Sequence, residues 1–154
     1  MPVLGGAKIR SMTRADLAAV LPIEAACYPD PWSQQTFEDC LAAQAKGYRC
    51  YILLLNGAIV GYAVVTVVVD QAELLNFCLA PRIQGQGRAI VYLQNLLDTL
   101  VAQGAAQLFL EVRQSNVPAR RLYASAGLSE VGVRKDYYPA HPGREDAILM
   151  AATL

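Results

Sequence analysis

Residues 74–89 read LLNFCLAPRIQGQGRA and decide the fold, because an apolar strand, a glycine-rich loop and the start of a helix follow one another directly. The apolar run 74–79 has the length of a strand. Two glycines fall within 84–87, and over 90–100 the apolar residues recur at every third or fourth position before Gly104, a good C-terminal cap. This segment predicts a strand, a loop and the longest helix of the chain.

Two further strands are predicted just before this segment. Residues 50–55 and 58–69 are rich in apolar and β-branched side chains, and Asn56-Gly57 between them is typical of a tight two-residue turn. They predict a β-hairpin, separated from the next strand by a polar break at 70–73. The apolar run 58–69 is shorter than the ~20 residues that span a bilayer, so it indicates a buried strand.

The chain begins with a predicted strand at 8–10 and a helix. Thr13 and Asp16 form a relative of the capping box that begins a helix. Pro22 lies well inside this helix and removes a hydrogen bond, so we expect a kink or break near Leu21.

A second helix is predicted to begin after Ser33, which is a good N-cap residue. Trp32 and Phe37 occupy the two positions of a hydrophobic staple around this cap. Phe37, Cys40 and Leu41 are then expected on its buried face.

The remaining elements complete a layered α/β domain. Residues 108–112 predict a strand, Asn116 can cap a helix that ends near Gly127, and 128–133 and 147–151 predict two closing strands. The element order is then β, α, α, β, β, β, α, β, α, β, β. It predicts a mixed, mostly antiparallel central sheet flanked by helices, with one strand-helix-strand crossover in its second half.

Composition limits the classes of function. The chain has 154 residues, 55% hydrophobic and 17% charged, which predicts one globular domain over residues 1–154. Its 13 Lys and Arg balance 13 Asp and Glu, so no overall charge favours binding to nucleic acid or an anionic membrane. No apolar segment follows Lys8 and Arg10 as in a secretory signal, and a cytoplasmic protein is expected.

The glycine-rich loop 84–87 suggests an anion site, although the glycines alone are better explained by a tight strand-to-helix turn. No Gly-Lys-Ser/Thr follows, which excludes a P-loop, and the dinucleotide fingerprint is absent. The spacing instead fits the motif Q-x-x-G-x-G/A, filled by Gln84, Gly87 and Ala89. This motif resembles the acetyl-coenzyme A (acetyl-CoA) signature of the GCN5-related N-acetyltransferases (GNAT), which have a similar element order.

Three other stretches resemble the bacterial ribosomal-protein-alanine N-acetyltransferases of that family: PWS at 31–33, LEVRQSN at 110–116, and DYYP with GREDA within 136–147. Those enzymes modify the N-terminal alanine of a small-subunit ribosomal protein, number eighteen. The resemblance implies direct acetyl transfer from acetyl-CoA to a protein α-amino group in a ternary complex, by a cytoplasmic monomer. Acetylation of a free small-molecule amine and a non-catalytic acyl-CoA-binding module are the alternatives.

Two residues are the candidate catalytic groups. Glu111 shares the alternating face of Phe109, where a lone glutamate is usually only exposed; the resemblance makes it the general base for an amine whose usual pKa is ~7.7–8.0. Tyr123 could be only a packing aromatic; the resemblance makes it the general acid that protonates the leaving thiolate. Having both favours an active enzyme.

The resemblance also assigns residues that bind cofactor and substrate. The backbone of Phe77, Cys78 and Leu79 would hold the pantetheine arm and the thioester carbonyl. The pyrophosphate would bind Gly85, Gln86, Gly87, Arg88, Ala89 and Ile90. Ala89 stands where the family has a second glycine, so its methyl group would narrow the space in which the backbone approaches the pyrophosphate. Arg88 would compensate by pairing with a phosphate. Asn116 would contact the cofactor as well as cap its helix, and Tyr137 and Tyr138 would line the peptide groove, although such tyrosines serve packing as often.

The four cysteines, Cys27, Cys40, Cys50 and Cys78, match neither a zinc site nor a C-x-x-C pair. Without a secretion signal, reduced core thiols are expected rather than disulfides. Cys78 as an acyl-enzyme nucleophile would need a nearby base, and the sole histidine, His141, is far along the sequence. One isolated histidine also predicts no metal site.

Overall fold

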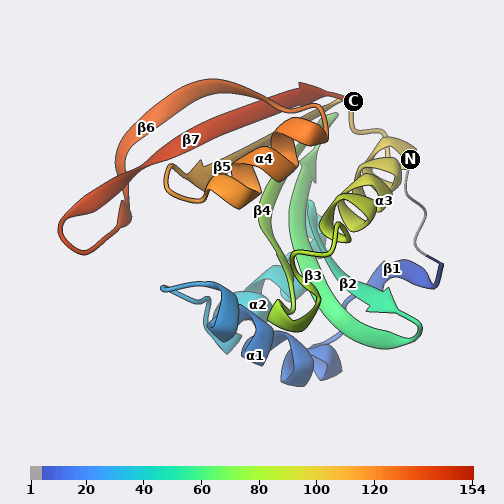
Figure 1. Cartoon of the computed structure of the whole chain (residues 1–154). Helices are drawn as coiled ribbons and strands as arrows, with labels where there is room; N and C mark the ends of the chain where they lie inside the picture. The colour runs from blue at the N-terminus through green and yellow to red at the C-terminus, as the bar shows by residue number, and fades with distance from the viewer. Residues whose placement is uncertain (1–4) are drawn as a thin grey trace.

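The computed structural model describes residues 5–154, whose strands form a single sheet in the order β1-β2-β3-β4-β5-β7-β6 (Figure 1). The strands are β1 (Ala7–Ser11), β2 (Tyr48–Leu55), β3 (Ala58–Val68), β4 (Gln71–Leu79), β5 (Gln107–Arg113), β6 (Ser129–Pro139) and β7 (Arg144–Thr153). The helices are α1 (Leu17–Cys27), α2 (Gln34–Ala42), α3 (Ala89–Ala102) and α4 (Val117–Ser125). This order along the chain confirms the predicted α/β fold class.

Strand pairing is antiparallel except between β4 and β5, which run parallel and are joined by α3. The predicted crossover is therefore confirmed. β7 inserts between β5 and β6, and the long β6–β7 hairpin extends away from the rest of the molecule (Figure 1). In the described part of the chain, no helix combines the length and apolar character needed to cross a membrane.

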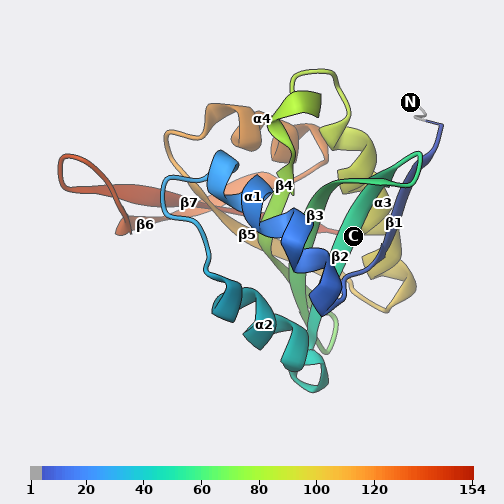
Figure 2. The ribbon, with the colours of Figure 1, turned by 90° about the horizontal axis from the view of Figure 1, so that it is seen from below.

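Helices cover the two faces of the sheet unequally. α3 and α4 pack on one face, where the side chains of Leu74, Leu108 and Leu110 join their core. α1 and α2 pack on the other face, over β2, β3 and β4 (Figures 1 and 2). On that second face β5 carries Phe109, which is 37% exposed, so the sheet is open there. We refer to this second face as the α1 face.

Local sequence signals predict several elements correctly. Asn56 and Gly57 both have positive φ, 51° and 83°, as the predicted two-residue turn between β2 and β3 requires. Ser33 Oγ accepts a hydrogen bond from Thr36 N at 3.1 Å, which confirms the N-cap of α2. The Trp32 and Phe37 rings lie 5.3 Å apart, as expected for the staple.

Of the kink or break expected near Leu21, the break is wrong. α1 continues through this proline from Leu17 to Cys27. Pro22 and Ala18, whose carbonyl loses its donor, are both exposed, so water can bond that carbonyl. On the opposite side, Val20 and Ile23 are buried and hold the helix against the sheet.

Three strand limits also differ from expectation. β4 begins at Gln71 rather than Leu74, because its first residues already pair with β3. β6 and β7 are much longer than predicted, and Tyr137 and Tyr138 lie within β6. β6 is an edge strand that pairs with β7 alone and is exposed at nearly every position, so it lacks the apolar alternation by which strands are recognised.

Candidate functional site

The candidate site lies at the end of the sheet where β4 and β5 stop pairing with each other. They pair only from Gln71–Leu74 with Gln107–Leu110; the rest of β4 pairs with β3 alone, and the rest of β5 with β7 alone. The β3–β4 register shifts so that Val64 faces Asn76 and Val65 faces Leu74, which leaves Leu75 as a bulge. Because a bulge bends its strand, β4 turns away and its edge at 76–79 is free on the β5 side. We call this gap the β4–β5 opening.

The backbone of Phe77, Cys78 and Leu79 lies on this free edge, where the sequence predicts the pantetheine arm. Their side chains are all buried in the two cores. A free strand edge presents N–H and C=O groups that can pair with an extended ligand. The geometry thus suits a cofactor arm that lies beside β4 as an extra strand would.

The predicted pyrophosphate loop joins the end of β4 to α3. Gly85 and Gly87 have φ of 73° and 71°, and no atom lies within 4 Å of where a Cβ would be built on either one. α3 begins at Ala89, and its N-cap, Arg88, supplies no side-chain acceptor to the free N–H groups of the first turn. Open backbone with free N–H groups at a helix N-terminus fits an anionic ligand.

Residues at both ends of the glycine loop attach it to the neighbouring elements. Gln84 Nε2 donates a hydrogen bond to Leu79 O at 2.7 Å and so ties the loop to β4. Ala89, the first residue of α3, is partly buried and packs against the core under that helix. Gln86 is exposed, and Arg88 and Ile90 are partly buried at the start of the helix.

Three tyrosines, Tyr28, Tyr123 and Tyr138, have raised pKa values, and one of them, Tyr28, contacts the free edge of β4. Tyr123, on α4, is buried, and burial raises its pKa above the usual value, with a smaller contribution from nearby Tyr138. Tyr28, at the end of α1, donates a hydrogen bond from its hydroxyl to Phe77 O at 2.9 Å. Burial also raises the pKa of Tyr28, and Tyr123 and Tyr138 add to it. The three phenols, from α4, α1 and β6, are therefore neighbours and stay protonated at neutral pH.

Glu111 lies on the α1 face of β5, directly after the last residue that pairs with β4. Its Oε1 is 3.3 Å from an Arg134 guanidinium nitrogen, whereas its Oε2 is buried and accepts no hydrogen bond from the described residues. The carboxylate borders a pocket of about 390 Å³ on this face, which Phe109 and Leu149 also line. Glu111 is thus a partly paired carboxylate with one free oxygen.

Tyr137 and Tyr138 follow an irregularity in β6. Asp136 has a φ of 53° and the register with β7 shifts there, so the two adjacent rings touch with centroids 4.9 Å apart. Arg113 lies over the Tyr138 ring and Arg134 over the Tyr137 ring, at 4.5 and 4.7 Å from the centroids. Burial, followed by Glu111, raises the pKa of Tyr138 to about 12, and the arginines oppose this. Tyr138 therefore packs against Arg113, which is two residues after Glu111 on β5, while Tyr137 is on the surface.

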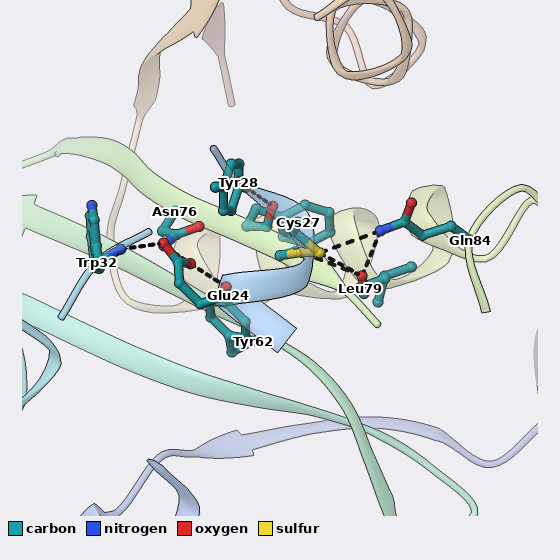
Figure 3. Close-up of a disulfide and its surroundings, with 10 residues drawn as sticks. Glu24, Cys27, Tyr28, Trp32, Tyr62, Asn76, Leu79 and Gln84 are labelled. Carbon is teal, nitrogen blue, oxygen red and sulfur yellow. Dashed lines mark hydrogen bonds between the residues drawn. A yellow bond between two sulfur atoms is a disulfide. The ribbon is translucent and has the colours of Figure 1, made fainter. Parts of the chain in front are cut away.

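Sequence reasoning did not find the buried carboxylate of Glu24. It is 1% exposed and accepts hydrogen bonds from Trp32 N and Asn76 Nδ2, both at 2.8 Å, and from the Tyr62 hydroxyl (Figure 3). Two signals could have indicated this network: Glu24 shares a helix face with Val20, and Asn76 interrupts an apolar run. The network links α1, the chain before α2, and β4.

The expectation of four reduced thiols is wrong for one pair. Cys27 and Cys78 form a disulfide between the end of α1 and β4, with a Cα–Cα distance of 7.1 Å (Figure 3). They are 51 residues apart, and only the packing of α1 on β4 brings them together, so their spacing gave no sign of the pair. Cys40 and Cys50 are free and buried, as expected.

Asn116 caps α4, because its Oδ1 accepts a hydrogen bond from Ala119 N at 3.3 Å. His141 is exposed between β6 and β7. Within residues 5–154, no three His, Cys, Asp or Glu side chains gather as a metal site would require. Asn116 therefore lies between the end of β5 and the start of α4.

Known proteins similar to this chain include N-acetyltransferases. The ribosomal protein bS18-alanine N-acetyltransferase of Escherichia coli strain K12 is 41% identical over 93% of this chain and 95% of its own length. A crystal structure of the ribosomal-protein-S18-alanine N-acetyltransferase from Escherichia coli has a TM-score of 0.86 and 40% identity, covering 96% of this chain and 93% of its own.

A more distant structure shares the fold. The protein yncA from Salmonella typhimurium, solved with its cofactor acetyl-CoA, has a TM-score of 0.78 at 21% identity and covers 97% of this chain and 95% of its own. The model of the acetyltransferase (GNAT) family matches residues 17–128, which include α1, the free edge of β4, the glycine loop, Glu111 and Tyr123. The chain therefore belongs to the GNAT family of acetyltransferases.

Proposed function

We propose that this protein transfers the acetyl group of acetyl-CoA to the α-amino group of the N-terminal alanine of ribosomal protein bS18. The observation that carries this proposal is the 41% identity, over almost the full length of both chains, to an enzyme named for that activity. The open α1 face beside Glu111 supports it, because a protein N-terminus needs an accessible groove. We further propose that the enzyme acts as a monomer in the cytoplasm, where ribosomal proteins are made.

Two segments would hold acetyl-CoA, which supplies the acetyl thioester. The loop with Gly85 and Gly87 and the start of α3 would bind the pyrophosphate, since both glycines leave open space above a backbone with free N–H groups. The free edge of β4 at 76–79 would bind the pantetheine arm by backbone hydrogen bonds. Asn116, at the start of α4, would add a polar contact.

Glu111 and Tyr123 would perform the proton transfers. Glu111 accepts a proton from the substrate ammonium group, either directly or through water, so that the nitrogen lone pair can attack the thioester carbonyl. Tyr123 then donates its phenolic proton to the sulfur as the carbon–sulfur bond breaks. Burial raises the pKa of Tyr123, so the phenol carries a proton at neutral pH before the thiolate leaves.

Direct transfer, without an acyl-enzyme, fits the position of Cys78. Its sulfur is bonded to Cys27, so it is not a free nucleophile. Tyr138 would form one wall of the peptide groove beside Glu111, and Tyr137, which is 41% exposed, would form the outer rim. Both amine and thioester would then be bound together before the reaction.

Mass spectrometry tests the substrate. Ribosomes from cells that lack this protein should carry bS18 lighter by one acetyl group, and supplying the wild-type protein should restore the mass. A variant with Glu111→Gln and Tyr123→Phe should fail to restore it although it folds. If bS18 is unmodified in cells that contain the protein, or if the purified protein acetylates free amines and not the bS18 N-terminal peptide, the proposal is wrong.

A further inference from the structure

Among residues 5–154, two buried side-chain polar atoms receive no hydrogen bond from the protein, and both are acceptors: Asn76 Oδ1 and Glu111 Oε2. A buried acceptor without a donor is costly, and native proteins leave few of them. Asn76 as a whole is 8% exposed. The pair therefore calls for a ligand that brings N–H or O–H donors.

The two atoms belong to the same place in the fold. Leu74 pairs with Leu110, Glu111 follows on β5, and Asn76 follows on β4 after the bulge at Leu75. Asn76 faces α1, since its side chain contacts Glu24. Glu111 points to the same side, because Leu110 beside it packs into the opposite core. Both acceptors thus lie on the α1 face, on the two sides of the β4–β5 opening.

Glu24 fixes which end of the Asn76 amide is free. A carboxylate only accepts hydrogen bonds, and Glu24 takes them from Trp32 N, the Tyr62 hydroxyl and Asn76 Nδ2. The amide nitrogen must therefore face Glu24. Figure 3 shows the Asn76 oxygen on the far side of the amide, turned toward Tyr28. Glu24 is in this way a positioning residue for the Asn76 oxygen.

We propose that Asn76 Oδ1 and Glu111 Oε2 together bind the α-amino group of the substrate, an inference that rests on the proposed function. Two acceptors on opposite sides suit a primary amine. Of its three ammonium protons, one passes to Glu111, one ends on the coenzyme A sulfur by way of Tyr123, and one stays on the new amide nitrogen. The last is the proton that Asn76 holds throughout the reaction. A secondary amine has no third proton for Asn76.

The test compares two peptides that carry the bS18 N-terminal sequence and begin with alanine or with N-methylalanine. Asn76→Ser removes the amide oxygen and should lower kcat/KM for the alanine peptide by roughly 10- to 100-fold, as expected for a hydrogen bond to a charged group. The rate on the N-methylalanine peptide should change by less than about 3-fold. The melting temperature and acetyl-CoA affinity of each variant are measured alongside.

Tyr62→Phe is the matched control, because it also removes a donor from Glu24 but leaves Asn76 intact. It should keep kcat/KM for the alanine peptide within about 3-fold of wild type. Equal losses in both variants, or equal losses of Asn76→Ser on both peptides, would mean that Asn76 only supports the fold. If Asn76→Ser does not fold, the test uses the wild-type enzyme alone. Equal kcat/KM on the alanine and N-methylalanine peptides would then overturn the inference.

The proposed function can fail separately. If the wild-type enzyme ignores the bS18 peptide but acetylates another primary amine, the same variants are measured with that amine and its N-methyl derivative, and the same outcomes apply. If no amine is acetylated, both the function and the amine site are overturned.

Discussion

Replacing Glu111 by glutamine keeps the size of the side chain and removes the proposed base. Lost proton transfer typically lowers a rate by ~10² to 10⁴. The fold should survive, because the carboxylate makes a single ion pair, at 3.3 Å, to Arg134, whose side chain is 52% exposed. Such exposed pairs contribute about 0–1 kcal/mol, so the melting temperature should change little.

The pH dependence gives a second magnitude for this variant. An α-amino group with a pKa of ~7.7–8.0 is mostly protonated at pH 7 and mostly neutral at pH 9, so its neutral fraction rises by about 5- to 10-fold. The Glu111→Gln variant can use only amine that is already neutral, so its rate should rise by about that factor, and no more, between pH 7 and pH 9. Tyr138 does not interfere, since burial is the main cause that raises its pKa to about 12.

The assay measures acetyl transfer to the bS18 N-terminal peptide from pH 7 to 9 with saturating acetyl-CoA. Arg134→Gln is the matched control, because it breaks the same ion pair and keeps the carboxylate. It should retain activity within a few-fold of wild type. Near-full activity of Glu111→Gln at pH 7, or an equal loss in Arg134→Gln, would refute the assignment of Glu111 as the base.

Three other changes probe the cofactor site, the acid and the fold. Tyr123→Phe should lower the rate by ~10² or more without recovery at pH 9, and titration should show unchanged acetyl-CoA affinity. Gly87→Val, at a φ of 71°, should weaken acetyl-CoA binding by about 10-fold or more in calorimetry, whereas Gly57→Val, at 83° in the distant hairpin, should leave that affinity unchanged. Arg10 lowers the pKa of Asp16 to about 2, so Asp16 stabilises the fold above its unfolded pKa near 4 and loses this effect as pH falls through 2. Urea unfolding should show Asp16→Asn less stable than wild type by about 1–2 kcal/mol at pH 7 and by much less at pH 2.

The parts of the fold that sequence predicts correctly depend on interactions within a few residues. The Asn56-Gly57 turn needs positive φ at both positions, and Ser33 and Asn116 each bond an N–H group three residues later. Such signals are complete in the local sequence, so no tertiary contact is needed to read them. The crossover between β4 and β5 followed for a similar reason, from a strand, loop and helix in succession.

The errors arose where distant contacts decide. Pro22 is tolerated because buried neighbours hold α1 to the sheet, and Cys27 meets Cys78 only through that same packing. The β6–β7 hairpin extends well beyond its apolar residues, since backbone pairing between the two strands is enough to continue it. None of these can be read from composition or periodicity in a short window.

The sequence shows which polar residues of the site are unusual, but not what each of them does. Glu111 and Asn76 are polar residues within otherwise apolar strands, and Glu24 is a carboxylate on the buried side of a helix. A polar residue at an apolar position lowers stability, so its presence indicates either a function or a buried hydrogen-bond partner. The pattern alone cannot separate these two cases. Glu24 is fully paired and serves to orient Asn76, while Asn76 and Glu111 each keep one oxygen free, and only the bulge at Leu75 places those oxygens on either side of one opening.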